Sequence, residues 1–138
     1  MTSIKQVQIA FDCADPARVA RFWCEVLGYV IPANWDEYEK TLPPERQGAG
    51  AVCSDPTGVG PRLYFQRVPE GKVAKNRVHL DVRVATGLVG QERLDRLEAE
   101  AARLVALGAT RGRLLLADEY NESCQNMQDI EGNEFCLD

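Results

Sequence analysis

Several features that mark whole functional classes are missing from this sequence of 138 residues. Its apolar runs stay well short of the ~18 residues that a membrane span needs. The opening stretch MTSIKQVQIAFD has neither the basic start nor the long apolar segment of a secretory signal peptide. Histidine, the commonest metal ligand in proteins, occurs once, as His79. These absences argue against a membrane protein and against any metal site that requires two histidines.

Basic residues are in deficit, because 16 lysines and arginines face 21 aspartates and glutamates, a formal net charge of 16 − 21 = −5. Binding to a nucleic-acid backbone needs a surplus of cations that displaces counterions. We therefore expect no nucleic-acid partner. The acidity would suit a cationic small molecule, although a mild negative charge commonly serves only solubility.

The five cysteines form no CxxC pair and no zinc-ribbon spacing. Their number is odd, and no secretory signal precedes them. We therefore expect reduced thiols that act mainly as small apolar side chains, in a cytoplasmic protein.

The most clearly predicted element is a helix that begins after Asp15. Asp15 is a good N-cap, Pro16 suits the first helical turn, and Gly28 suits the position after the last turn. Between them an apolar stripe recurs at helical spacing, at Val19, Phe22, Trp23, Val26 and Leu27. The preceding residues 7–13, VQIAFDC, alternate as a half-buried strand does.

Residues 29–50 begin as a strand and continue as a long polar excursion that contains Trp35 and Tyr38. These aromatics fit either a short surface helix or a flap over a ligand. Two short strands follow, AVCSD and RLYFQRV, joined by the turn residues PTGVGP.

The same plan then restarts after a polar linker, PEGKVAK. RVHLDVRV predicts a strand, and residues 92–107 predict a helix with Leu94, Leu97, Ala101 and Leu104 on one face. RLLLA, CQNMQD and EFCLD are the later candidate strands. Gln8 then corresponds to His79, an offset of 79 − 8 = 71, and Arg62 to Glu134, an offset of 134 − 62 = 72. A long internal period indicates a repeated structural unit.

We therefore predict an α+β fold built from two tandem βαβββ modules that form a cupped mixed sheet. The modules span residues 1–68 and 75–138, and together they make a single domain over residues 1–138. One such module leaves an apolar sheet face open, so two must pair to close a core.

The stretches FDCADPARVARFWCEVLGY, KNRVHLDVRV, LVALGATR and MQDIEGNEFCLD resemble the glyoxalase/bleomycin-resistance/extradiol-dioxygenase superfamily, the vicinal-oxygen-chelate proteins, and within it the glyoxalase-like branch. The resemblance covers nearly the whole chain. It implies paired βαβββ modules, commonly in a homodimer, and in the metal enzymes of the superfamily a divalent ion inside the cup. Carried over to this sequence, the four ligand positions are Gln8, Arg62, His79 and Glu134.

The resemblance thus implies a metal site of His79, Glu134 and Gln8 for one divalent ion, Zn²⁺, Ni²⁺, Mn²⁺ or Fe²⁺. Arg62 cannot join it, because a guanidinium has no lone pair to offer. Extradiol cleavage is disfavoured, because an iron site with two histidines and a carboxylate needs a second histidine. A metal-free pocket is the alternative, and a structural role for His79 within its strand stays open beside both.

Without a metal, Glu134 would act as the catalytic base and Arg62 as the group that stabilises a substrate oxygen or grips a carboxylate. Gln66 has the same facing parity as Arg62 and could take its place in the cup. Trp35 and Tyr38 would cover the ligand, so we predict substrate binding by Arg62, Gln66, Trp35 and Tyr38. Asp12 and Asp81 share the facing parity of Gln8 and His79.

Three functions remain open at this point. The first is a glyoxalase-like lyase or isomerase that acts on a small oxygenated metabolite in the sheet cup. The second is a metal-free, non-catalytic dimer of the bleomycin-resistance type that sequesters a ligand, for which the flap aromatics would suit a cationic aromatic molecule. The third is a purely structural dimer. In each case we expect a homodimer without nucleic-acid or membrane partners.

Overall fold

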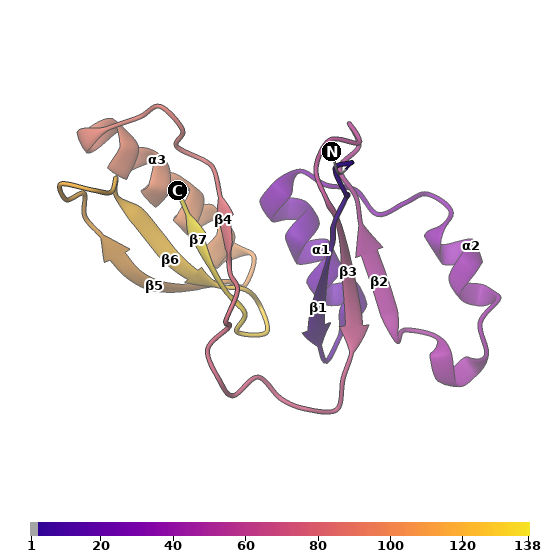
Figure 1. Ribbon diagram of the computed structural model, residues 1–138. Coiled ribbons are helices and arrows are strands. Elements are labelled where there is room, and N and C mark those ends of the chain that lie inside the picture. The colour runs from indigo at the N-terminus through magenta and orange to yellow at the C-terminus, as the bar shows by residue number, and fades with distance from the viewer. Residues whose placement is uncertain (1–2) are drawn as a thin grey trace. The chain divides into compact units, whose positions relative to one another are not determined.

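The structure of the chain is a computed structural model that describes residues 3–138. The chain divides into two compact units, Met1–Gly71 and Lys72–Asp138, called here the first and the second unit. Each unit holds one small mixed sheet and at least one helix (Figure 1), so the predicted α+β class is confirmed. That both units make up a single domain stays a prediction.

The first unit contains a sheet of three strands in the order β1-β3-β2. Its elements are β1 (Gln8–Cys13), α1 (Pro16–Leu27), α2 (Trp35–Lys40), the 3-10 helix η1 (Pro44–Arg46), β2 (Gly50–Cys53) and β3 (Arg62–Arg67). β1 pairs with β3 in parallel, with Gln8 opposite Arg62. β2 pairs with β3 in antiparallel fashion.

Helix α1 has the ends that the sequence predicts. The Asp15 side chain accepts a hydrogen bond from the backbone N–H of Arg18, and Gly28 ends the helix with a φ of 72°. A φ of this sign favours glycine, since a Cβ there meets the backbone. The predicted stripe faces the sheet, where the rings of Phe11 and Trp23 have centroids 5.1 Å apart.

The two faces of the first sheet differ in burial. Leu63 and Phe65 of β3 are fully buried on the face that α1 covers. The alternate residues of β1, Gln8, Ala10 and Asp12, are exposed on the other face. Because side chains alternate along a strand, the core residues of this sheet lie on one face and the exposed residues of β1 lie on the other.

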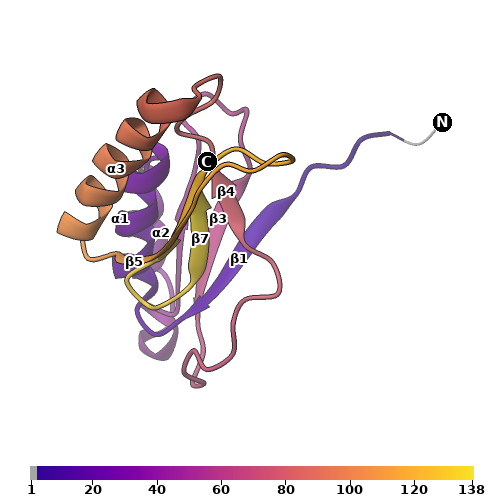
Figure 2. The same ribbon diagram turned by 90° about the vertical axis from the view of Figure 1, so that its left-hand side faces the viewer.

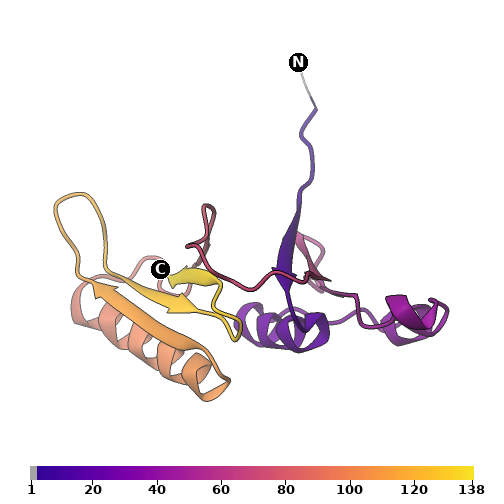
Figure 3. The same ribbon diagram turned by 90° about the horizontal axis from the view of Figure 1, so that it is seen from below.

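Residues 31–49, called here the α2 flap, replace a regular strand in the first unit. Val30 forms an isolated bridge with Ser54, and the chain then leaves the sheet and forms α2 and η1. Figure 3 shows α2 beyond the β2 edge of the sheet rather than beneath it. Neither α2 nor η1 has a buried residue, so the α2 flap adds no residue of these two helices to the core.

The second unit contains a sheet of four strands in the order β4-β7-β6-β5. Its elements are β4 (Leu80–Val82), α3 (Gly90–Ala106), β5 (Thr110–Leu115), β6 (Cys124–Gln128) and β7 (Glu134–Leu137). Figure 2 shows α3 along one side of these strands. Leu97, Ala101 and Leu104 are buried on the helix face that was predicted from the sequence.

Strand β4 is shorter than the strand predicted over RVHLDVRV. It begins only at Leu80, so His79 lies outside it. The reason lies in the preceding backbone. The N–H of Asn76 donates to the Glu134 side chain at 2.9 Å instead of to a neighbouring strand. Residues 77–79 are exposed as a result.

Arg93 is a buried charged residue of α3, with 3% of its surface exposed. Its guanidinium donates to the backbone oxygens of Ser123 and Ala85 at 2.8 and 3.0 Å. It also forms an ion pair of 2.6 Å with Asp138. Arg93 thus ties α3 to the segments that adjoin β4, β6 and β7. None of the helices among residues 3–138 has the length and apolar character that crossing a membrane requires.

Candidate functional site

A pocket of about 440 Å³ opens in the first unit between the α2 flap and the face of β2 and β3 that carries Val52 and Tyr64. This is within the usual size range of small-molecule sites. Its lining is mixed aromatic, aliphatic and cationic: Pro32, Asn34, Trp35, Tyr38, Leu42, Arg46, Ala49, Gly50, Val52, Arg62 and Tyr64. The structure therefore brings three of the sequence-predicted residues, Trp35, Tyr38 and Arg62, to one cavity.

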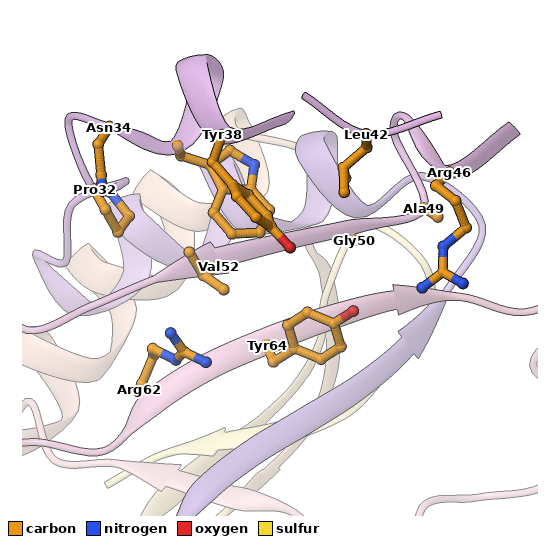
Figure 4. A pocket seen from close by; sticks show the side chains of 11 residues that line it. Pro32, Asn34, Tyr38, Leu42, Arg46, Ala49, Gly50, Val52, Arg62 and Tyr64 are labelled. Carbon is orange, nitrogen blue, oxygen red and sulfur yellow. The ribbon is translucent and has the colours of Figure 1, made fainter. Parts of the chain in front are cut away.

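Two arginines set the charge of this pocket. Figure 4 shows the guanidinium groups of Arg46 and Arg62 at opposite ends, with the Tyr64 ring between them. Arg62 comes from β3 and Arg46 from η1. None of the described residues that line the pocket is acidic. The lining therefore carries two positive charges and no compensating carboxylate.

The aromatic cover of the pocket is held by contacts within the flap. The rings of Trp35 and Tyr38 have centroids 5.3 Å apart, since the two residues lie three apart on one face of α2. The Glu39 carboxylate accepts a hydrogen bond of 2.8 Å from the N–H of Gly48 and so joins the end of α2 to the end of the flap. Gly48 has a φ of 76°, which favours glycine at this turn.

Arg62 is oriented by the strand opposite. Its Nε donates to the Oε1 of Gln8 at 2.6 Å, and the two residues are direct partners in the parallel register. The bond occupies Nε alone, so the two terminal nitrogens keep the donor pair that suits a carboxylate or phosphonate.

Gln66 has a different environment from the one expected. It lies outside the lining of the pocket, and its Nε2 donates to the Oδ1 of Asp12 at 2.7 Å. Gln66 and Asp12 are again direct partners across β1 and β3. The first sheet thus carries two polar cross-strand pairs, of which only the Arg62 pair borders the pocket.

The other two predicted ligands lie in the second unit and have close partners of their own. His79 Nε2 lies 3.3 Å from the Oδ1 of Asp81. Glu134 forms an ion pair of 3.1 Å with Lys72 and accepts the N–H of Asn76 at 2.9 Å. His79 and Glu134 therefore each point to a protein group within the second unit.

The contacts of Glu134 determine its acidity. Partial burial by itself would raise the pKa of this carboxyl, but the hydrogen bonds from Asn76 and Lys72 outweigh it and hold the pKa below its ordinary value. A carboxylate with a lowered pKa is a weak proton acceptor at neutral pH. The geometry thus suits Glu134 better as a structural anion than as a general base.

The donor set implied by the family resemblance does not fit a divalent ion in this structure. The Oε1 of Gln8 accepts from Arg62, so a cation bound there would lie beside a guanidinium that repels it. Both oxygens of Glu134 accept hydrogen bonds, one from Lys72 and one from Asn76. An ion would have to displace the Lys72 ammonium before it could bind. We therefore derive no chemical step from a metal held by Gln8, His79 and Glu134.

Among the lining residues that sequence reasoning missed are Arg46 and Tyr64. Tyr64 shares the facing parity of Arg62, being two residues along the same strand, so the strand period was a usable signal. Arg46 had no such signal. Its position depends on how the flap folds back, which is set by contacts such as Glu39 with Gly48 across 9 residues.

Comparison with known proteins places the chain in a family. The sequence model of the glyoxalase-like domain matches residues 8–137. No curated protein matches the chain. Among solved structures, an enzyme of the glyoxalase/bleomycin resistance protein/dioxygenase family from Burkholderia phytofirmans PsJN is similar, with a TM-score of 0.64, 13% identity, and 94% of each chain covered.

Two further solved structures have the same fold. A mutant of the fosfomycin resistance protein FosX from Listeria monocytogenes, in complex with Mn(II) and a dihydroxypropylphosphonic acid, has a TM-score of 0.66 and 10% identity, covering 99% of this chain and 90% of its own. A possible glyoxalase from Bacillus cereus has a TM-score of 0.61 and 16% identity, with 98% of both chains covered. At such identities the likeness concerns the fold. With its family model matched over almost the whole length, this chain belongs to the glyoxalase-like domain family.

Proposed function

We propose that this glyoxalase-like protein binds a small organic anion, a carboxylate or phosphonate with an apolar or aromatic body, in the pocket of the first unit. The observation that carries the proposal is the lining itself, in which Arg46 and Arg62 stand at the two ends without an acidic neighbour in the lining. An anion would gain charge-assisted hydrogen bonds from Arg62. A cationic aromatic ligand, which the overall acidity suggested, would be repelled.

The remaining lining suits the body of such a ligand. Tyr38 lies above the strands that carry Val52 and Tyr64 (Figure 4), and Trp35 also lines the pocket. Burial of apolar surface supplies affinity, while the arginines select the charge and orientation of the ligand. The Listeria neighbour was crystallised with a phosphonic acid, which is a member of the same class of anion.

Binding without chemistry is the simpler form of this proposal. The lowered pKa of Glu134 speaks against its predicted role as a base, and the lining of the pocket offers no carboxylate in its place. A metal-assisted lyase or isomerase is the second candidate. It is supported by the Mn(II) in the Listeria neighbour but not by the donor contacts of Gln8 and Glu134 in this chain. The homodimer and the cytoplasmic location are further parts of this proposal.

The test uses three probes with one phenyl ring and different charge: phenylphosphonate, the neutral phenylacetamide and the cationic benzylamine. Binding is followed by the fluorescence of Trp35, with Trp23 as the constant background because it is 1% exposed. We expect phenylphosphonate to bind at least ~10-fold more tightly than either other probe, since one hydrogen bond to a charged group contributes about 1.5–3 kcal/mol.

Two variants locate the anion. Arg62→Gln should weaken phenylphosphonate binding by roughly 10- to 100-fold while phenylacetamide changes little. Arg21→Gln, at an exposed position on α1 outside the lining, is the matched control and should bind as the parent does. Equal affinity for all three probes, or an equal response of both variants, would refute the anion site.

A further inference from the structure

The second unit brings three different metal-ligating side chains to one point, outside the pocket of the first unit. These are His79, Asp81 and Cys136, from which one donor atom each can be chosen so that all three lie within 4.8 Å of one another. The cluster combines a nitrogen, an oxygen and a sulfur donor, whereas a cluster of surface acids offers oxygen alone. Their arrangement follows from the pairing of the strands.

The register of the second sheet explains the convergence. β4 runs parallel to β7 with Asp81 directly opposite Cys136. Val82 and Phe135, the neighbours of these two residues along the chain, are buried, so Asp81 and Cys136 share the opposite, accessible face. His79 precedes Asp81 by two residues and has the same parity.

The donor atoms lie near the spacing that a tetrahedral ion requires. Two ligands at about 2.0 Å from a tetrahedral Zn²⁺ are about 3.3 Å apart, and a nitrogen or oxygen and a sulfur at about 2.3 Å are about 3.5 Å apart. His79 Nε2 and Asp81 Oδ1 already lie 3.3 Å apart. Cys136 needs to approach by at most about 1.3 Å, the difference between 4.8 and about 3.5 Å.

The chemistry of the donors selects the ion. A nitrogen, a carboxylate oxygen and a sulfur together suit a borderline ion such as Zn²⁺ and do not suit Mg²⁺ or Ca²⁺, which prefer oxygen alone. We propose that His79, Asp81 and Cys136 form a zinc-type site with its fourth position open to water. On binding, the Cys136 thiol gives up its hydrogen bond of 3.0 Å to the Oδ1 of Asn126 and transfers its proton to solvent, and the thiolate takes a place on the ion.

This set differs from the one that the family resemblance implied. Only His79 is common to both, and Glu134 is held by Lys72 and Asn76 at 3.1 and 2.9 Å. Asp81 and His79, in contrast, have 56% and 42% of their side chains exposed, so solvent ions reach them freely. An ion here would join β4 to β7 across their parallel pairing.

The decisive experiment is a Co²⁺ titration of the reduced, EDTA-treated full chain, read by absorption. We expect one Co²⁺ per chain, with a near-ultraviolet thiolate-to-cobalt band, intense tetrahedral visible bands, and full displacement by Zn²⁺. His79→Ala, Asp81→Asn and Cys136→Ser should each weaken binding by roughly 100-fold or more. Only Cys136→Ser should remove the thiolate band while leaving weak cobalt absorption at high Co²⁺.

Two controls make the assignment specific. Cys124→Ser replaces the thiol that interacts with Cys136, and Glu134→Gln removes the carboxylate of the alternative set. Both should keep Co²⁺ binding and the thiolate band. Loss of binding in Glu134→Gln but not in Asp81→Asn would overturn the proposal, and so would the absence of any thiolate band in the parent. Asp81 is exposed, so Asp81→Asn stays informative even where Cys136→Ser fails to fold.

Discussion

Replacing Arg93 by methionine should destabilise the second unit more than any comparable change at its surface. Arg93 donates at 2.8 Å to Ser123, at 3.0 Å to Ala85 and at 2.6 Å to Asp138. Methionine keeps the aliphatic stem but is shorter and has no donor, so the backbone oxygens of Ser123, Ala85 and Leu88 and the Asp138 carboxylate each lose one hydrogen bond. Removing one side of a buried ion pair costs about 3–5 kcal/mol.

The lower part of that range is the better expectation here. Asp138 is also held by Arg83 at 2.8 Å, and 29% of its side chain is exposed. Part of its charge therefore stays compensated, and we expect a loss of about 3 kcal/mol in the free energy of unfolding. Urea unfolding followed by circular dichroism gives the free energy, and hydrogen exchange of peptides from residues 72–138 places the loss in the second unit.

Arg96→Met is the matched control, because Arg96 lies one turn further along α3, is exposed, and makes a single bond of 3.2 Å to Val84. We expect it to change stability by no more than about 0.5 kcal/mol. If both variants lost the same stability, or if exchange increased only in residues 3–71, the reasoning from buried hydrogen bonds would be wrong.

Two other predictions concern the first unit. Hydrogen bonds from the Thr57 hydroxyl and from the N–H groups of Gly60 and Thr57 lower the pKa of Asp55, so its contribution to stability is present above the unfolded pKa and is lost as the pH falls through the lowered one. Asp55→Asn should therefore differ from the parent at pH 6, and the difference should shrink as the pH falls through the lowered pKa of Asp55; unfolding curves that stay equally far apart at every pH would contradict this. In Gly50→Ala the new Cβ would lie 2.7 Å from the Tyr64 hydroxyl, which must move within the pocket. We expect phenylphosphonate affinity to fall several-fold while the free energy of unfolding changes by less than about 1 kcal/mol, and an unchanged affinity would argue that Tyr64 does not touch the ligand.

The parts of the fold that the sequence predicts best are those with a local period. The helix after Asp15 and the helix of the second half follow from stripes at helical spacing, and their buried faces are the predicted ones. The family resemblance over the whole chain is likewise confirmed by the match to residues 8–137. For α1, the local signals of the Asp15 cap and Gly28 also mark its two ends.

The sites were harder to predict because they depend on contacts between distant segments. Facing parity indicated that Asp81 and His79 share a side, but only the register of β4 with β7 brings Cys136 beside them. Likewise, that Glu134 would be an ion-paired carboxylate depends on Lys72, a linker residue 134 − 72 = 62 positions away. Neither pairing leaves a periodic trace in the sequence. The roles assigned to Gln8, His79 and Glu134 from the resemblance, and to Gln66 from its facing parity, stay predictions.

The α2 flap separates ligand recognition from folding. It supplies Trp35, Tyr38 and Arg46 to the pocket, yet α2 and η1 contribute no buried residue to the core. In the second unit, a regular strand, β5, follows the helix. At the corresponding point after α1, the first unit has only the Val30–Ser54 bridge, and the flap comes next. Substitutions in the flap can therefore alter ligand preference at little thermodynamic risk, which makes residues 31–49 the natural segment for diversification by evolution or by library design.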